Sequence, residues 1–193
     1  DIVGANVVAG PFYAATGRTW RMTESGRAEL RDELRSNLEP VVSLAEKAGV
    51  TLAIDPLNRY ETSFINTVEQ ALDVLEPLLG DSLGIALDTY HLNIEEKNIT
   101  GAVLSAAGHI KHVQVCGNDR GAVGDDHILW PAFLDALDDA GYGGTLNLES
   151  FTAGNATIAT AASIWRPLAA SQDALAERSL RCLSTLQEGK TPR

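Results

Sequence analysis

Short runs of β-prone residues recur along the chain, and each is followed by a longer segment with helical periodicity. Parallel strands need long crossover connections, so this alternation favours a parallel sheet with helices between its strands. The predicted strands cover residues 6–9, 51–55, 84–88, 110–115 and 145–149. Because no linker or low-complexity segment separates these units, we expect a single domain over residues 1–193.

Helical periodicity is clearest over residues 24–48, where apolar side chains recur at three- and four-residue steps. Gly49 follows at the position where a helix commonly ends in the left-handed conformation. Further helices are predicted after the capping residue Thr67, around residues 100–107, from Trp130 onward, and over residues 171–186.

Parallel strands at this spacing form either a doubly wound open sheet or a (β/α)8 TIM barrel. No Gly-rich G-x-G-x-x-G fingerprint follows any predicted strand, which disfavours the nucleotide-binding open sheet. A barrel needs eight strands and typically about 250 residues. We therefore expect an α/β fold in which this chain supplies only the C-terminal five βα units of a TIM barrel, with the first three units lying elsewhere.

The charge balance limits the partners that this chain can bind. Its 26 acidic and 15 basic residues give a formal net charge of −11, which repels nucleic acid. No apolar run approaches the roughly 20 residues that span a bilayer, and the first residues lack a signal-peptide pattern. We expect no membrane association, a cytoplasmic location, and two reduced core thiols, Cys116 and Cys182.

Polar side chains stand at the ends of four predicted strands. Asp55, Asp88 and Glu149 end their strands, and Gln114 lies near the end of another. Strand ends converge on one rim in parallel α/β folds. An aspartate there commonly caps the next helix, but grouped carboxylates are costly without a cation. A divalent metal site is therefore favoured over simple capping.

Three carboxylates and an amide carbonyl form an all-oxygen ligand set. Hard oxygen donors suit Mn²⁺, our first choice, or Mg²⁺ better than zinc. An ion held in this way can polarise a carbonyl and stabilise the enediolate formed when a neighbouring carboxylate removes the α-proton.

Three further side chains are candidates for substrate contacts. Glu61 can reach back over the site or be an exposed loop charge, and His91 can bond a substrate hydroxyl or be a loop histidine bonded to backbone. Arg120 can bind a substrate oxygen or form a surface ion pair. Aromatic residues that can wall the pocket are Tyr13, Trp20 and Trp165.

Three segments carry a specific resemblance to a known family. They read IDPLNRYE over residues 54–61, LDTYHLNIEE over residues 87–96 and LESF over residues 148–151. These segments resemble the signatures of the xylose isomerase-like TIM-barrel superfamily of sugar phosphate isomerases and epimerases, and most closely ketose 3-epimerases of the D-tagatose/D-psicose type. GPFY over residues 10–13 and IWRPL over residues 164–168 fit as well, so the similarity covers essentially the whole chain.

The resemblance implies roles for each candidate residue. In that family four strand-end side chains hold Mn²⁺ or a similar ion such as Mg²⁺ or Co²⁺. Two of the four act on opposite faces of the sugar, one removing the C3 proton and the other returning a proton. Carried onto this chain, whose strands would be barrel strands 4–8, the acid/base pair is Asp55 and Glu149. The remaining metal ligands are Asp88 and Gln114, and the substrate contacts are Glu61, His91 and Arg120.

Two positions depart from the epimerase pattern. Gln114 stands where histidine is usual, although relatives such as hydroxypyruvate isomerases use glutamine there. Asp55 stands where glutamate is expected, and the shorter side chain withdraws the carboxylate by about 1.5 Å. Misplacement of about 1 Å can cost on the order of 10²-fold in rate.

The expected function is that of a metal-dependent ketose or keto-sugar isomerase or 3-epimerase, assembled as a homodimer or homotetramer. The alternatives are a hydroxypyruvate-type isomerase, a lyase or dehydratase acting on keto-sugars or inosose, and a non-catalytic barrel fragment or subunit. An apurinic-site endonuclease would need several histidine ligands and a basic groove, and neither is evident in the sequence. The sugar, its phosphorylation and the reaction outcome stay open at this point.

Overall fold

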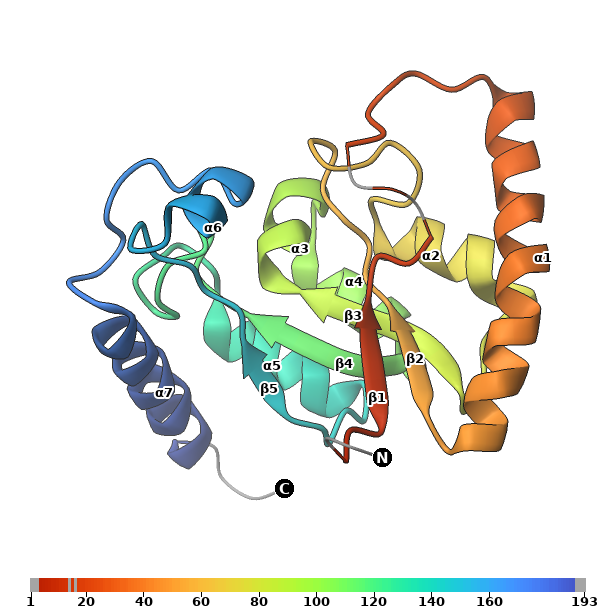
Figure 1. Cartoon of the computed structure of the whole chain (residues 1–193). Coiled ribbons are helices and arrows are strands. Elements are labelled where there is room, and N and C mark those ends of the chain that lie inside the picture. The colour runs from red at the N-terminus through yellow and green to blue at the C-terminus, as the bar shows by residue number, and fades with distance from the viewer. Residues whose placement is uncertain (1–3, 14, 16, 190–193) are drawn as a thin grey trace.

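The computed structural model describes residues 4–13, 15 and 17–189. Five parallel strands form one curved sheet in chain order (Figure 1). They are β1 (Val7–Gly10), β2 (Thr51–Ile54), β3 (Leu83–Asp88), β4 (Ile110–Val115) and β5 (Leu146–Leu148). All five predicted strands are confirmed, and their ends differ from the prediction by one residue at most.

The register of the sheet aligns the carboxyl ends of neighbouring strands. Asp88 pairs with Gln114 across β3 and β4. Val115 pairs with Leu148 across β4 and β5, so Glu149 follows directly at the same edge. Asp55 comes immediately after β2, and its backbone N–H donates to the Gly10 carbonyl. The polar strand ends therefore share one rim of the sheet.

Five helices match the sequence prediction. They are α1 (Glu24–Ala48), α2 (Val68–Leu75), α4 (Ile99–Ser105), α5 (Trp130–Asp139) and α7 (Gln172–Glu188), with a single 3-10 turn, η1 (Glu76–Leu78), after α2. Helix α1 ends at Gly49, whose φ of 66° suits glycine. A capping box between Thr67 and Gln70 begins α2.

Two short helices, α3 (Thr89–Glu95) and α6 (Ala156–Ala161), were not predicted. Helix α6 has only six residues, too few to show helical periodicity, whereas α3 follows β3 with no connecting loop to mark its start. Helix α3 begins directly after β3, and the Asp88 side chain accepts a hydrogen bond from the Tyr90 backbone N–H. His91 therefore lies on a helix, so the alternative of a loop histidine is wrong.

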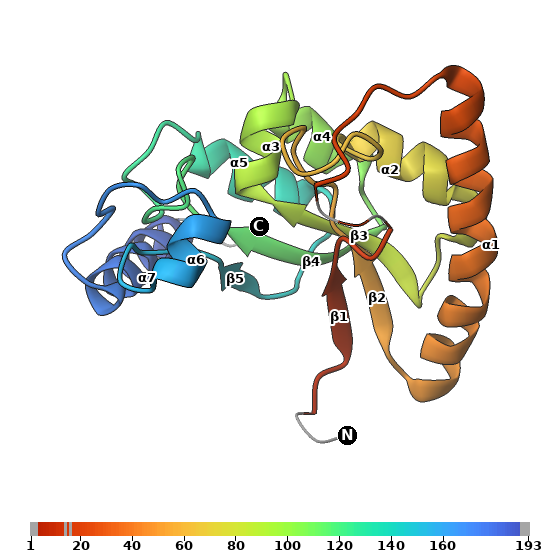
Figure 2. The same ribbon diagram turned by 45° about the horizontal axis from the view of Figure 1, so that its top comes forward.

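The main hydrophobic core lies between the sheet and the helices that follow its strands. Figures 1 and 2 show α1, α2, α4 and α5 along one face of the sheet. All six residues of β3 are buried, as are the core side chains Leu75 of α2, Val103 of α4 and Phe133 of α5. The edge strands of the described sheet are β1 and β5, and Val8 of β1 is 49% exposed.

Among the residues that the structure describes, no helix has both the length and the apolar character needed to cross a membrane. Both cysteines are free thiols, as expected; Cys116 is buried and Cys182 is partly buried.

Candidate functional site

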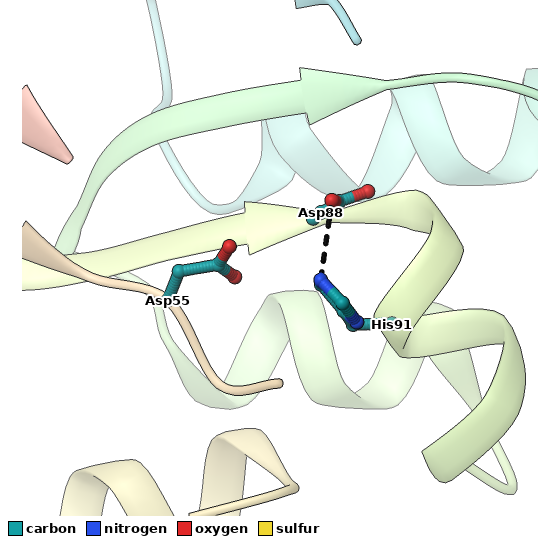
Figure 3. Close-up of side chains that lie close together, drawn as sticks. All are labelled: Asp55, Asp88 and His91. Carbon is teal, nitrogen blue, oxygen red and sulfur yellow. Dashed lines mark ion pairs between the residues drawn. The ribbon is translucent and has the colours of Figure 1, made fainter. Parts of the chain in front are cut away.

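Three buried side chains meet at the carboxyl ends of β2 and β3. Asp55 follows β2, Asp88 ends β3, and His91 lies one helical turn into α3 (Figure 3). One possible ligand atom from each of these residues lies within 4.8 Å of the others. Two of the three were predicted as metal ligands, whereas His91 was predicted as a substrate contact.

The two oxygens of Asp88 face different partners. Its Oδ1 accepts a hydrogen bond of 2.9 Å from the Tyr90 backbone N–H and so caps α3. Its Oδ2 accepts a bond of 2.6 Å from Arg120 Nη1 and lies 3.6 Å from His91 Nε2. Helix capping and a role in the site are therefore not alternatives for Asp88, because one oxygen serves each.

Arg120 lies at the centre of the acidic residues and is only 7% exposed. Its Nη1 donates to Asp88 at 2.6 Å and to Glu149 at 2.9 Å. Its guanidinium carbon lies 4.3 Å from the centre of the Tyr90 ring and 5.5 Å from that of Phe151. The alternative of a surface ion pair is therefore wrong. The guanidinium is a buried cation that partly neutralises the carboxylates.

Glu149 and Gln114 are bonded to one another at the ends of β5 and β4. Gln114 Nε2 donates to Glu149 Oε2 at 2.7 Å, and the same oxygen accepts from Arg120. This bond uses the amide nitrogen of Gln114, so the carbonyl oxygen is the atom suited to a cation. Burial raises the pKa of the Glu149 carboxyl, although the Arg120 charge opposes the shift.

Asp55 is the least compensated acid of the site. Burial, followed by the charges of Asp88 and Glu149, raises the pKa of its carboxyl well above the usual range. Its Oδ1 is buried and has no hydrogen-bond partner among the described residues. A buried oxygen without a donor is costly unless a proton or a cation satisfies it. The donor set around it, mostly carboxylate and amide oxygens, fits a hard divalent ion.

Asn58 is a site residue that the sequence prediction missed. It is 1% exposed, and its amide nitrogen donates to Glu61 Oε1 at 2.8 Å and to His91 Nδ1 at 2.9 Å. Glu61 is thereby held at the site and is not a free loop charge. Burial and, next, the Arg120 charge lower the pKa of His91 to about 4, so the imidazole is neutral at neutral pH. One sequence signal could have identified Asn58 as a site residue. It lies between Asp55 and Glu61, in the segment that carried the resemblance.

A cleft of about 590 Å³ opens above these residues. Glu61, Arg120 and Glu149 contribute polar atoms to its lining. Its described apolar wall comes from residues that the sequence prediction did not single out, Tyr60, Tyr90, Phe151 and Ile158. Of the aromatic residues proposed instead, Tyr13 is buried and bonded to Ile65 and Leu57, whereas Trp20 and Trp165 are 52% and 75% exposed outside this lining.

Comparison with known proteins gives consistent matches. Residues 3–185 match the family described as "Xylose isomerase-like TIM barrel". The chain is 38% identical over 176 residues to "Probable ketose 3-epimerase" of Synechocystis sp., covering 91% of this chain and 61% of that protein. It is 37% identical over 179 residues to "L-ribulose 3-epimerase" of Mesorhizobium japonicum, covering 92% and 59%.

Solved structures agree with these matches. A structure of L-ribulose 3-epimerase superposes with a TM-score of 0.86 at 32% identity, over 96% of this chain and 62% of that one. This chain thus spans about three fifths of the length of its relatives. Its five parallel strands form a half-barrel, as expected for part of a (β/α)8 barrel. The chain belongs to the xylose isomerase-like TIM barrel family.

Proposed function

We propose that this chain carries the metal- and substrate-binding part of a divalent-metal-dependent sugar epimerase or isomerase, of the ketose 3-epimerase type. The observation that carries the proposal is the buried Oδ1 of Asp55, which has no hydrogen-bond partner among the described residues. It is grouped with the carboxylates of Asp88 and Glu149, and Glu149 lines the cleft. The names of the relatives, ketose 3-epimerase and L-ribulose 3-epimerase, support the substrate class. Assembly into a homodimer or homotetramer and a cytoplasmic location stay predictions.

The residues proposed to hold the metal are Asp55, Asp88, Gln114 and Glu149. Three carboxylates and an amide oxygen favour Mn²⁺, with Mg²⁺ or Co²⁺ as alternatives. When bound, such an ion acts as a Lewis acid that draws electron density from the substrate carbonyl. The neighbouring C3–H would then be acidic enough for a carboxylate base to remove its proton.

The proposed proton carriers are Asp55 and Glu149. One carboxylate takes the proton from C3, and the other delivers a proton to the opposite face of the same carbon, so the configuration at C3 is inverted without net gain or loss of atoms. Burial raises the pKa of both carboxyls in the metal-free site, and a bound dication would oppose that shift. As an ionised carboxylate, each group can accept the carbon-bound proton and give it up again.

Three polar side chains of the site would orient the sugar. The Arg120 guanidinium and the His91 imidazole border the acids, and Glu61 lines the cleft beside Arg120. Arg120 can donate to a substrate oxygen only from its remaining N–H groups, since Nη1 is bonded to two carboxylates. These contacts would fix the hydroxyls adjacent to C3 in reach of the bases.

The test is incorporation of solvent deuterium at C3 of L-ribulose or D-psicose by the purified chain with Mn²⁺. We expect exchange by the wild type and its loss in Glu149→Gln, which keeps the shape of the side chain but not its basicity. The control is Glu46→Gln, an exposed position on α1. Undiminished exchange in Glu149→Gln, or no exchange by the wild type with either ketose, would contradict the proposal.

A further inference from the structure

The side chain of Asn58 has a defined orientation in the site. Its Oδ1 accepts a hydrogen bond of 2.9 Å from the Tyr60 backbone N–H, so this atom must be the carbonyl oxygen. Its Nδ2 therefore faces Glu61 Oε1 at 2.8 Å and His91 Nδ1 at 2.9 Å. The Asn58 backbone N–H donates to the same Nδ1 at 3.1 Å.

Two N–H donors thus converge on one nitrogen of His91. Nδ1 can accept them only with its lone pair, so it carries no hydrogen. A neutral imidazole has one ring N–H, which must then be at Nε2. Both the Nδ1–H tautomer and the doubly protonated ring would set hydrogens against the donors of Asn58, so the geometry excludes them.

Nε2–H faces the acidic part of the site. It lies 3.6 Å from Asp88 Oδ2 and 3.3 Å from Arg120 Nη2. Because Nε2 and Nη2 are then both donors, they do not bond to each other. Both can instead direct their hydrogens at one oxygen acceptor placed between them.

We propose that Asn58 is a positioning residue that holds His91 in its Nε2–H tautomer, which makes His91 a hydrogen-bond donor to a substrate oxygen and prevents it from binding the metal. The substrate part of this inference rests on the proposed function, whereas the tautomer does not.

This assignment decides between two readings of the buried cluster. The proximity of Asp55, Asp88 and His91 alone is consistent with an Asp–Asp–His metal centre. A histidine that binds metal through Nε2, however, carries its hydrogen on Nδ1 and donates it to a carbonyl or carboxylate. Here Nδ1 faces donors, which is the opposite arrangement. His91 is therefore a neighbour of the metal ligands and not one of them.

A second contact fixes the loop that carries Asn58 against α3. Arg59 forms a two-pronged ion pair with Glu95, from Nε to Oε1 and from Nη2 to Oε2, both at 3.0 Å. The Arg59 backbone N–H also donates to Glu95 Oε1 at 2.7 Å. Glu95 lies one turn after His91 on the same helix, so the loop and the imidazole are held in register.

The experiment is ¹⁵N NMR of the imidazoles in the ¹⁵N-labelled chain at neutral pH, without metal and with saturating Mg²⁺, which is diamagnetic. The chain has four histidines, and the loss of signals in His91→Gln assigns those of His91. We expect a protonated Nε2 and an unprotonated Nδ1 under both conditions. A protonated Nδ1 in the wild type, or a metal-bound Nε2 with Mg²⁺, would overturn the proposal without any Asn58 variant.

The variant Asn58→Asp tests whether the Asn58 side chain sets the His91 tautomer. It places a carboxylate opposite Nδ1, so we expect the form with a hydrogen on Nδ1 to become the major one. The matched control is Asn66→Asp, because Asn66 also holds this loop, through bonds to the carbonyls of Leu57 and Thr62. We expect the control to keep Nε2–H. An unchanged His91 signal in a folded Asn58→Asp variant would show that the Asn58 side chain does not set the tautomer.

The outcomes separate this inference from the proposed function. A chain that exchanges no deuterium into a ketose but shows the tautomer and its reversal contradicts the function and supports the role of Asn58. A chain that exchanges deuterium while Nδ1 is protonated contradicts only the role of Asn58.

Discussion

Replacing Asp55 with asparagine tests the central electrostatic argument. The substitution keeps the shape of the side chain and removes one charge from a cluster whose ligand atoms lie within 4.8 Å of one another. At an effective dielectric constant of about 20, two unit charges at that separation repel by roughly 3 kcal/mol. Proton uptake by Asp55 and the attraction of Arg120 offset part of this cost. We therefore expect the metal-free variant to be about 1–2 kcal/mol more stable than the wild type.

The metal should oppose this difference in stability, because it stabilises the wild type more than the variant. A ligand at about 100 times its Kd stabilises a protein by roughly 2.7 kcal/mol. For a domain of this size about 1 kcal/mol moves the Tm by roughly 2–4 °C. Thermal unfolding should thus show the metal-free Tm of Asp55→Asn raised by about 2–8 °C. The wild type should gain about 5–11 °C with Mn²⁺, and the variant less than half of that gain.

The pH dependence has a definite sign. The raised pKa of Asp55 means that the folded state holds this proton more tightly than the unfolded chain does. Its contribution to stability is therefore fully present below the ordinary carboxyl pKa and is lost as the pH rises through the folded value. The gain from Asp55→Asn should accordingly grow with pH.

The matched control is Asp81→Asn, at an exposed position just before β3 and at the opposite end of the strand from Asp88. It should change the Tm by no more than about 1–2 °C, with or without Mn²⁺. The reasoning would be refuted if Asp55→Asn lowered the metal-free Tm and kept the full Mn²⁺ gain.

Other substitutions probe neighbouring contacts. Asp55→Glu restores the longer side chain and should raise deuterium exchange by on the order of 10-fold or more if carboxylate placement limits the rate; a fall would show that the site is built around aspartate. Arg120→Gln leaves two carboxylates without their cation, so thermal melts should show a metal-free loss of about 3–5 kcal/mol that Mn²⁺ partly restores. Glu95→Gln removes the charge that pairs with Arg59, which steady-state kinetics should register mainly as a higher KM, with kcat nearly unchanged.

The sequence predicted most of the fold because its main signals are local. The apolar stripe of residues 24–48 gave α1 with its correct ends, and the alternation of β-prone runs with helical segments gave all five strands. Helix α6 was missed because six residues hold too few turns to show a period, and α3 was missed because it begins directly after β3. The strand-end acids could be predicted because each ends a strand that the sequence identifies, and a parallel sheet brings equivalent strand ends to one rim.

The sequence by itself thus determined which acids could meet and at which rim of the sheet. Only the tertiary structure decided how they meet. Asp88 serves α3 with one oxygen and Arg120 with the other, and Arg120 reaches it from 32 positions away. His91 receives the hydrogen bonds of Asn58 across a separation of 33 residues. The direction of a hydrogen bond between distant segments depends on how the loops dock on the sheet, and no local pattern of residues encodes that.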